Sequence, residues 1–485
     1  MNVRDTIAAG AARESAAPEA EAQIASLVAR SRAAQQAFEF AGQETLDTAA
    51  AAAAWAIMEP TRNRQLAEQA VRDTGLGNAD DKFRKNYRKT LGLLRDLHGQ
   101  KTCGVIARDE SRGIVEIARA VGVVAAITPS TNPAATPANK IVNALKCGNA
   151  VIVAPSPKGY DSCALLIEFI HAQFAKAGLD PALVQMLPAP VSKAATAALM
   201  READLVVATG SQANVRMAYT SGTPAFGVGA GNVASIVTRT ANLRDAAHKI
   251  AASKTFDNAT SCSSENSVVI EDAVYDAMLR ELAACGGVLL DARQKAQLQA
   301  AMWSDGKLAA RCTAKSAAQI ASIAGLDDVA ADEPAFLMVE ESGFGASHPF
   351  SGEKLSPVLT VYRARDLDAA AAIVRKLYAY MGAGHSVGLH TGARGEHDEA
   401  VTLGSTLPVA RVIVNQAHCF ATGGNFDNGL PFSLSMGCGT WGRNNFSDNL
   451  GFRQYLNITR VAYPIEERVP EVDALLGDYF RRFGQ

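Results

Sequence analysis

The sequence predicts an α/β protein built from two doubly wound lobes, and three observations lead to this fold class. The chain has 485 residues, too many for one core, which suggests two to four domains. Short apolar runs at 122–127 and 150–153 alternate with helical segments, a pattern typical of parallel sheets covered on both faces. A second α/β stretch follows without a Pro-, Gly- or Ser-rich linker, so we expect a cleft between adjoining lobes.

Composition and charge exclude several classes of protein. Hydrophobic residues make up 48% of the chain and charged residues 20%, which excludes general disorder. The formal net charge of −2 gives no basis for binding nucleic acid or an anionic membrane. The apolar run at 49–58 is too short to span a bilayer, and the N-terminus lacks the apolar core of a secretory signal. We therefore expect a cytoplasmic protein.

The predicted elements of the first lobe begin after a helical region. Residues 1–20 are polar and are interpreted as an N-terminal tail or a loosely docked helix, and residues 21–100 have helical spacing. The strands expected next lie at 113–120, 122–127, 150–153, 183–187 and 205–208, with helices at 138–145, 161–177 and 192–202.

The second lobe has the same alternation. Expected strands lie at 233–237, 268–270, 358–361, 387–390 and 412–414, and expected helices at 246–256 and 274–284. The final segment, 455–463, alternates between apolar and polar residues and predicts a strand that pairs with another element.

The cysteines are scattered, and none forms a Cys-x-x-Cys pair, which argues against a zinc ribbon and fits a reducing compartment. We expect no metal site. Cys262 differs from the others because it lies among small polar residues just before a strand, where backbone amides could stabilise a thiolate. A buried structural cysteine is an equally good interpretation of that segment alone. The remaining cysteines, which favour the structural interpretation, are Cys103, Cys147, Cys163, Cys285, Cys312, Cys419 and Cys438.

Two loops follow predicted strands at their carboxyl ends, where open parallel sheets bind ligands. In the first, the amide of Asn132 could donate to an oxyanion, although an Asn-Pro turn explains this loop better on its own. In the second, Thr209-Gly210-Ser211 opens a helix whose N-terminus can receive a phosphate, and a plain N-cap at Ser211 is the alternative.

Two glycine-rich segments are weaker signals. The motif at 437–442 matches G-x-G-x-x-G but lacks the flanking strand and helix, so a turn is the better interpretation. The glycines at 227–231 indicate that the backbone closely approaches a ligand or a packing neighbour.

Taken in order, these segments resemble the aldehyde dehydrogenase family over about residues 24–464. The resemblance rests on 128–133, 146–151, 209–211, the Cys262 segment and 353–358. It implies a Rossmann-like cofactor domain over 21–101 and 119–236, and a catalytic thiol domain over 237–440. It also implies a β oligomerisation element over 102–118 and 441–485, and hence a homodimer or homotetramer.

The resemblance also implies roles for individual residues. Cys262 would be the nucleophile and Asn132 an oxyanion donor. NAD or NADP would be the cofactor, and the choice stays open because Ala154 stands where ordinary members have a lysine that Lys158 only partly replaces. The implied cofactor contacts are Thr128, Pro129, Ser156, Lys158, Thr209, Gly210, Ser211, Gly229 and Glu353.

Within the family the chain looks like the CoA-acylating branch. Ordinary members carry a water-activating glutamate where Gly227 stands here, and without such a base a thioester must wait for a better nucleophile than water. Coenzyme A fits as co-substrate because a thiol is more acidic and more nucleophilic than water. Two further signatures of this branch are residues 73–86 and residues 431–450.

The resemblance implies a short aldehyde as substrate, with sulfoacetaldehyde first and acetaldehyde or propionaldehyde as alternatives. Arg239, Arg443 and Arg453 are available for a sulfonate, but each is better explained as a surface or ion-pair residue, and none is assigned. A catalytically silent homologue is the alternative from another class. In some acylating relatives an N-terminal helix targets a protein-shelled compartment, but for residues 1–20 a plain tail is favoured.

Overall fold

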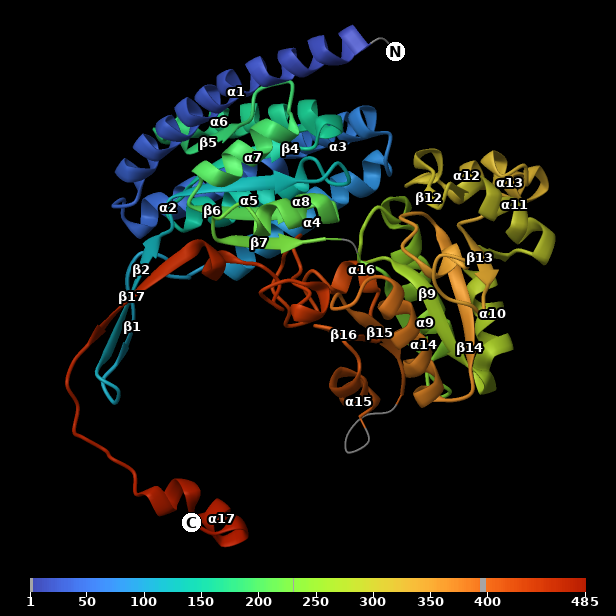
Figure 1. Cartoon of the computed structure of the whole chain (residues 1–485). Helices are drawn as coiled ribbons and strands as arrows, with labels where there is room; N and C mark the ends of the chain where they lie inside the picture. The colour runs from blue at the N-terminus through green and yellow to red at the C-terminus, as the bar shows by residue number, and fades with distance from the viewer. Residues whose placement is uncertain (1–2, 230, 393–397) are drawn as a thin grey trace.

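Two open parallel sheets organise the chain in the computed structural model, which describes residues 3–229, 231–392 and 398–485 (Figure 1). Each sheet is covered by helices on both faces, and a small antiparallel sheet projects from the first lobe. The predicted fold class is therefore confirmed.

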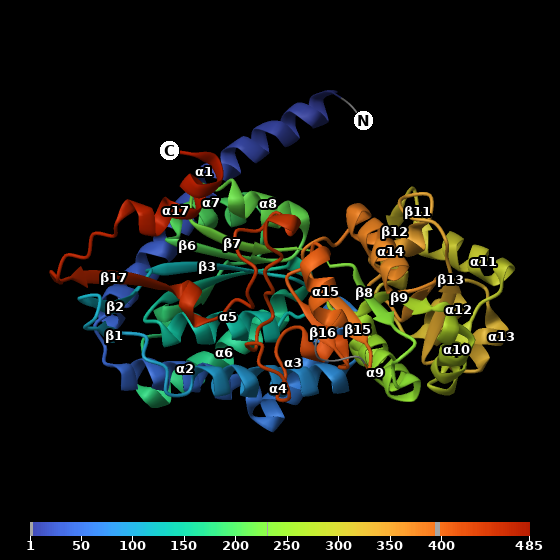
Figure 2. The ribbon, with the colours of Figure 1, turned by 90° about the horizontal axis from the view of Figure 1, so that it is seen from below.

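The first sheet has five strands in the order β5-β4-β3-β6-β7, all parallel. Its apolar strands are buried from both sides, as the continuous apolar runs predicted. Figure 2 shows α1, α7 and α8 on one face and α2, α5 and α6 on the other. The strands are β3 (Val123–Thr128), β4 (Ala150–Pro155), β5 (Val184–Met186), β6 (Leu205–Thr209) and β7 (Ala225–Val228). The helices are α1 (Val3–Phe38), α2 (Gln43–Met58), α3 (Pro60–Thr74), α4 (Ala79–Leu97), α5 (Ala135–Lys146), α6 (Tyr160–Ala177), α7 (Lys193–Glu202) and α8 (Gln212–Tyr219).

The second sheet has seven parallel strands in the order β10-β13-β14-β9-β8-β15-β16. Helices α9 and α10 pack on one face, and α14 and α15 pack on the other. The strands are β8 (Val233–Val237), β9 (Glu265–Glu271), β10 (Gly287–Leu289), β13 (Phe336–Glu340), β14 (Val358–Ala364), β15 (Val387–His390) and β16 (Val412–Val414). The helices are α9 (Leu243–Thr255), α10 (Tyr275–Ala284), α11 (Ala292–Met302), α12 (Ala317–Ile323), α13 (Asp327–Ala331), α14 (Leu367–Tyr380), α15 (Glu399–Thr406) and α16 (His418–Ala421); a two-stranded hairpin joins β11 (Trp303–Ser304) to β12 (Lys307–Leu308).

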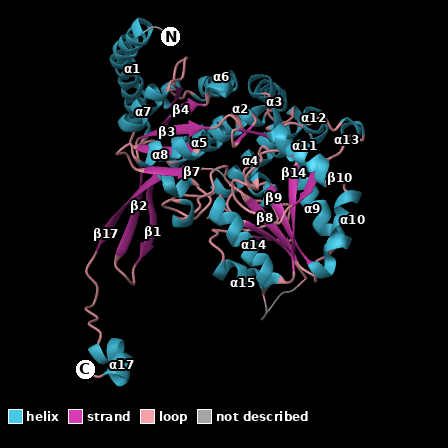
Figure 3. Cartoon of the chain, turned by 45° about the vertical axis from the view of Figure 1, so that its right-hand side comes forward, coloured by secondary structure: helices cyan, strands magenta, loops and turns pink. Residues whose placement is uncertain are grey.

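The third sheet orders its strands β1-β2-β17, with β1 (Gly104–Asp109), β2 (Ile114–Ala120) and β17 (Leu456–Ala462). The predicted terminal strand exists, and its partner β2 belongs to the same chain. After β17 the chain runs away from both lobes to a last helix, α17 (Val472–Phe483), as Figures 1 and 3 show. No described residue of α17 is buried.

The structure adds detail at three predicted boundaries. The cofactor domain is predicted to end at residue 236, a position that lies inside β8, and β8 pairs within the second sheet. Residues 1–20 are predicted to be a tail or a loosely docked helix, and the chain is helical from Val3 onward. Leu450 and Tyr455 belong to the predicted oligomerisation element, and both are buried in the core of the first lobe.

Among the described helices, none combines the length and apolar character needed to cross a membrane.

Candidate active site

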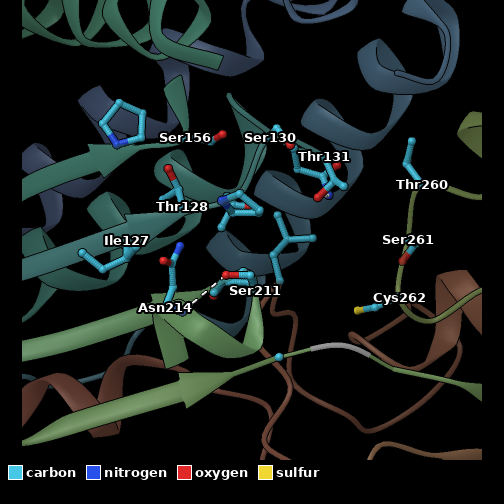
Figure 4. Close-up of a pocket in the computed structure, with 18 of the residues that line it drawn as sticks. Ile127, Thr128, Ser130, Thr131, Ser156, Ser211, Asn214, Thr260, Ser261 and Cys262 are labelled. Atoms are coloured by element: carbon cyan, nitrogen blue, oxygen red, sulfur yellow. Dashed lines mark hydrogen bonds between the residues drawn. The ribbon is translucent and has the colours of Figure 1, made fainter. Parts of the chain in front are cut away.

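A pocket of about 530 Å³ lies where the carboxyl ends of β3, β4 and β6 face the loop before β9 (Figure 4). This is the edge at which doubly wound sheets bind ligands. Ten of the eleven predicted site residues line it: Thr128, Pro129, Asn132, Ser156, Thr209, Gly210, Ser211, Gly229, Cys262 and Glu353. The exception is Lys158, which is exposed on a 3₁₀ turn (Pro157–Gly159) outside the pocket lining.

Cys262 lies in the loop between a 3₁₀ turn (Phe256–Ala259) and β9, and its side chain reaches the pocket (Figure 4). Its Sγ is 3.6 Å from Nε2 of His385, whose Nδ1 is 2.7 Å from Oγ of Ser386. Gly231 makes this approach possible, because a Cβ there would lie 2.5 Å from the Cys262 carbonyl oxygen. The thiol is thus paired with an imidazole that the sequence did not single out.

Burial keeps both members of this pair neutral. It raises the pKa of the Cys262 thiol to about 12, helped by the charge of Glu353. It lowers the pKa of His385 to about 3, helped by the nearby Arg411. A neutral imidazole can accept a proton from the thiol, but only when the reaction itself stabilises the sulfur as it attacks.

Two groups at the pocket have N–H donors with few partners in the protein, the backbone of Cys262 and the side chain of Asn132. The backbone N–H of Cys262 has no acceptor among the described residues. The side-chain amide of Asn132 makes only a 3.5 Å contact to Oγ1 of Thr131 through its nitrogen, while its oxygen accepts a 2.8 Å hydrogen bond from Lys85. These are the donors that an oxyanion on an attacked carbonyl carbon requires.

Lys85 comes from α4, and Asp257 holds it in place. The Nζ of Lys85 lies 2.6 Å from the Asp257 carboxylate, which also binds Lys82 at 3.1 Å and Oγ1 of Thr260 at 2.7 Å. Burial alone would raise the pKa of Asp257, but the charges and hydrogen bonds of the two lysines hold it below its usual value. An ionised, fully buried carboxylate therefore connects α4 to the nucleophile loop.

The backbone that carries this carboxylate is strained. Asp257, Asn258 and Ala259 have φ angles of 52°, 51° and 57°, in the left-handed region that residues with a side chain seldom adopt. The turn between α3 and α4 holds the strained residues from the other lobe. Gly77 packs against Asp257 so closely that a Cβ would lie 1.8 Å from its Oδ1, and the N–H of Asn78 donates to the same oxygen at 3.0 Å.

The rest of the pocket fits a dinucleotide. Oγ1 of Thr128 is buried without a hydrogen-bond partner, as expected of a group that meets a ligand. Ser211 caps α8, and both Ser211 and Thr209 line the pocket, so the N-terminus of that helix lies at the pocket wall. Figure 4 shows Asn214 on the opposite side of the pocket from Cys262. Lys193 and Thr196 of α7 also line the pocket.

Glu353 lies at the Cys262 end and accepts a 3.3 Å hydrogen bond from the N–H of Gly231. Burial raises the pKa of Glu353 to about 8. Its carboxyl group can bind ribose hydroxyls in either protonation state.

Gly227, the position predicted to have lost a base, lies in β7. A Cβ at Gly227 would meet Val215 at 2.9 Å and Tyr219 at 3.1 Å, and Gly227 does not line the pocket. The inference that the site lacks a separate carboxylate to activate water has support from the pocket lining. Among the described residues that line the pocket, Glu353 is the only carboxylate.

The remaining sequence signals are structural. The predicted turn at 437–442 is confirmed, with a 3₁₀ turn (Thr440–Gly442) at its end. Arg411 fastens this segment beside the site by donating to the carbonyl oxygens of Gly437 and His385 at 2.9 Å and 3.1 Å. Arg239 is exposed beside Glu271, and neither Arg443 nor Arg453 lines the pocket.

Comparisons with known proteins agree with this geometry. The model of the aldehyde dehydrogenase family matches residues 9–289. The chain is 73% identical to an acylating sulfoacetaldehyde dehydrogenase of Cupriavidus necator over 462 residues, covering 95% of this chain and 93% of the relative. It is 40% identical to an acylating sulfoacetaldehyde dehydrogenase of Bilophila wadsworthia, covering 91% of this chain and 95% of the relative.

Among solved structures, an acetylating aldehyde dehydrogenase from Geobacillus thermoglucosidasius superimposes with a TM-score of 0.88 at 32% identity. The match covers 94% of this chain and 99% of that one. The sequence relatives, the shared fold and the thiol in its inter-lobe pocket agree, and the chain belongs to the aldehyde dehydrogenase family.

Proposed function

We propose that this enzyme is a CoA-acylating dehydrogenase that oxidises sulfoacetaldehyde to its CoA thioester with NADP or NAD. The observation that carries the proposal is Cys262, which lines the pocket and is paired with the buried His385, while Glu353 is the only carboxylate among the described lining residues. The substrate assignment is supported by the 73% identity to an acylating sulfoacetaldehyde dehydrogenase.

The first step is attack of Cys262 on the aldehyde carbon. The S–C bond forms, and the thiol proton passes to Nε2 of His385, 3.6 Å away. The carbonyl oxygen becomes an oxyanion, which the Asn132 amide and the Cys262 N–H stabilise. One such donor is worth about 3–4 kcal/mol in related oxyanion sites.

The oxidised nicotinamide supplies the hydride acceptor when it is bound. Glu353 would hold its ribose, while Thr128 and the N-terminus of α8 at Ser211 would bind the rest of the dinucleotide. Transfer of hydride from the tetrahedral carbon to the nicotinamide would leave a thioester on Cys262, and His385 would release the thiol proton to solvent before the next step.

The second half of the reaction transfers the acyl group. A CoA thiol attacks the thioester carbon, His385 accepts its proton, and the sulfur of Cys262 leaves and is reprotonated. An imidazole whose pKa is lowered to about 3 is too weak a base to activate water well, whereas a thiol is far more acidic. The thioester on Cys262 should therefore react with CoA much faster than with water.

Lys193 is the residue we propose to decide between NADP and NAD. It is exposed at the start of α7 and lines the pocket, whereas Lys158 does not. A 2′-phosphate on the adenosine ribose would meet its ammonium group. Lys193→Ala should raise the KM for NADP and leave the KM for NAD unchanged; equal changes would assign Lys193 to neither.

We further propose a homo-oligomer in the cytoplasm. The exposed apolar side chains of the C-terminal segment need a covering partner, and a second copy of this chain supplies one. Its eight cysteines are all free thiols, as a reducing compartment maintains them.

The test follows reduced cofactor at its absorbance band, with sulfoacetaldehyde, acetaldehyde or propionaldehyde, and with or without CoA. Turnover should require CoA, and Cys262→Ala should lower kcat/KM by at least about 10⁴-fold. His385→Ala should lower kcat by roughly 10²- to 10⁴-fold. Free acid formed without CoA at a comparable rate would contradict the proposal.

A further inference from the structure

Four basic side chains of α4 lie in or beside the catalytic pocket, and one of them has no hydrogen-bond partner among the residues that the structure describes. Lys82, Lys85 and Lys89 are buried, and their ammonium groups are used by the protein itself. Arg88 is half-buried and donates no hydrogen bond to any described residue. The acceptors of the lysines are Thr131 and Asp257 for Lys82, Asn132, Asp257 and Thr260 for Lys85, and the carbonyl groups of Phe420, Gly423 and Gly424 for Lys89.

These four basic side chains of α4 outnumber the carboxylates that form ion pairs with them. Asp257 is the one carboxylate within ion-pair distance of these side chains among the described residues. Burial lowers the pKa of Lys89 to about 7 and that of Lys82 to about 8, so these two lose charge readily. Arg88 keeps its charge at neutral pH, because a guanidinium does not deprotonate there. In a chain of net charge −2, this positive excess is local.

Arg88 lines the pocket that contains the catalytic thiol. It also lines an adjoining cavity of about 390 Å³. It lies one helical turn from Lys85, which touches Asn132, and side chains three residues apart on a helix are neighbours. Its guanidinium lies 5.8 Å from the ring centre of Phe420, which lines both cavities.

We propose that Arg88 binds the anionic group of the aldehyde substrate, which is the sulfonate of sulfoacetaldehyde. This inference rests on the proposed function. The sulfonate is two bonds from the carbonyl carbon, so a substrate attacked by Cys262 extends only a short way toward α4. A guanidinium suits it because two parallel N–H groups can bind two of its oxygens. The aromatic wall at Phe420 keeps water from this pair and strengthens it.

Kinetics with charged and neutral aldehydes test the assignment. Arg88→Met should lower kcat/KM for sulfoacetaldehyde by roughly 10- to 150-fold, as loss of a hydrogen bond to a charged group does. The value for propionaldehyde should stay the same or rise, and Arg88→Lys should recover part of the loss. Arg95→Met is the matched control, because Arg95 is on the same helix and also stacks on Phe426 but lines neither cavity. It should leave both substrates unaffected.

A second measurement does not depend on turnover. In 2-bromoethanesulfonate the electrophilic carbon is as far from the sulfonate as in sulfoacetaldehyde. The Cys262 sulfur displaces bromide and forms a thioether, which intact-mass spectrometry detects. Relative to the neutral reagent 2-bromoethanol, the sulfonate should label the wild-type enzyme faster, and Arg88→Met should remove this advantage.

The outcomes separate the two proposals. If Arg88→Met lowers kcat/KM equally for charged and neutral aldehydes, Arg88 does not bind the sulfonate. If Arg88→Met raises only the KM for CoA, Arg88 binds the phosphates of CoA instead, and the proposal is also overturned. Sulfoacetaldehyde turnover that survives in Arg88→Met, with unchanged labelling, would overturn it while the function stands. If the wild-type enzyme does not turn over sulfoacetaldehyde, but 2-bromoethanesulfonate labels Cys262 faster in the wild type than in Arg88→Met, the proposed function is rejected and the anion site at Arg88 is kept.

Discussion

At the scale of single residues, the central feature of the site is that Cys262 and His385 are both uncharged at neutral pH because both are buried. Because the pKa of Cys262 is raised to about 12, the thiolate fraction below that pH grows about tenfold per pH unit. His385, with its pKa lowered to about 3, stays neutral from mildly acidic to alkaline pH and adds no titration there.

The resting enzyme should therefore react slowly with a neutral alkylating reagent. We expect the rate of inactivation by iodoacetamide to keep rising between about pH 7 and pH 10 without levelling off, because the thiol remains mostly protonated over that range. The rate is measured as loss of activity, with Cys262→Ala as the mass-spectrometric control. A plateau near pH 8 would show that the thiolate already forms at rest.

Lys85 acts through Asn132 rather than on the substrate. Its hydrogen bond to the amide oxygen leaves the amide nitrogen directed at the oxyanion position. Lys85→Met should lower kcat by roughly 10- to 100-fold with little change in KM, a smaller loss than the 10²- to 10³-fold expected for removing the donor itself by Asn132→Ala.

The double variant provides the decisive measurement. Residues that act through one group are not additive, so Lys85→Met should cost little more once Asn132 is already alanine. Additive losses would mean that Lys85 supports the fold and not the amide.

At the scale of elements, the turn between α3 and α4 fixes the nucleophile loop from the opposite lobe. Gly75 and Gly77 both have positive φ, 65° and 70°, but only at Gly77 would a Cβ collide with Asp257. Gly77→Ala should therefore lower both stability and kcat, while Gly75→Ala should cost only its backbone strain of roughly 1–2 kcal/mol.

Comparing the two variants removes the shared strain and leaves the contact with Asp257. Denaturant unfolding and kcat are measured for both. If Gly75→Ala and Gly77→Ala are equally destabilised and equally active, the turn does not position the nucleophile.

Most strands could be predicted because local sequence specifies them. The runs at 122–127, 150–153 and 205–208 are apolar throughout, and each is a buried strand in the structure. β7 (Ala225–Val228) was missed because its glycine hides the apolar pattern, and β13 (Phe336–Glu340) was not singled out.

The pocket was predictable where residues follow strand ends, since parallel strands bring these loops together. The partners of Cys262 and Asn132 were not, because they arrive over long separations. His385 is 123 residues from Cys262, and Lys85 is 47 residues from Asn132. The one local signal was the spacing of Lys82, Lys85 and Lys89, which places three lysines on the buried face of an amphipathic helix.

At the scale of the whole molecule, the C-terminal segment, residues 464–485, extends away from both lobes of its own chain. The N–H of Tyr463 still donates to Gly113, and beyond it the chain leaves the body (Figure 1). The exposed large apolar side chains from Tyr463 onward are Tyr463, Ile465, Val469, Val472, Leu475, Leu476, Tyr479 and Phe483.

Deleting residues 464–485 should therefore change assembly and not the fold of one chain. We expect light scattering to report a smaller particle than for the full chain, because the apolar segment packs on a second copy. Circular dichroism of the truncated protein should show the same secondary structure apart from α17. An unchanged particle mass would assign the contact between copies to another surface.

The burial that keeps Cys262 protonated has a consequence for survival under oxidative stress. Peroxide attacks thiolates, and a cysteine whose pKa is raised to about 12 offers almost none at neutral pH. The free enzyme thus keeps its nucleophile in a form that resists conversion to sulfenic acid. Damage would concentrate in the brief interval of each turnover when the sulfur carries charge and the substrate already covers it.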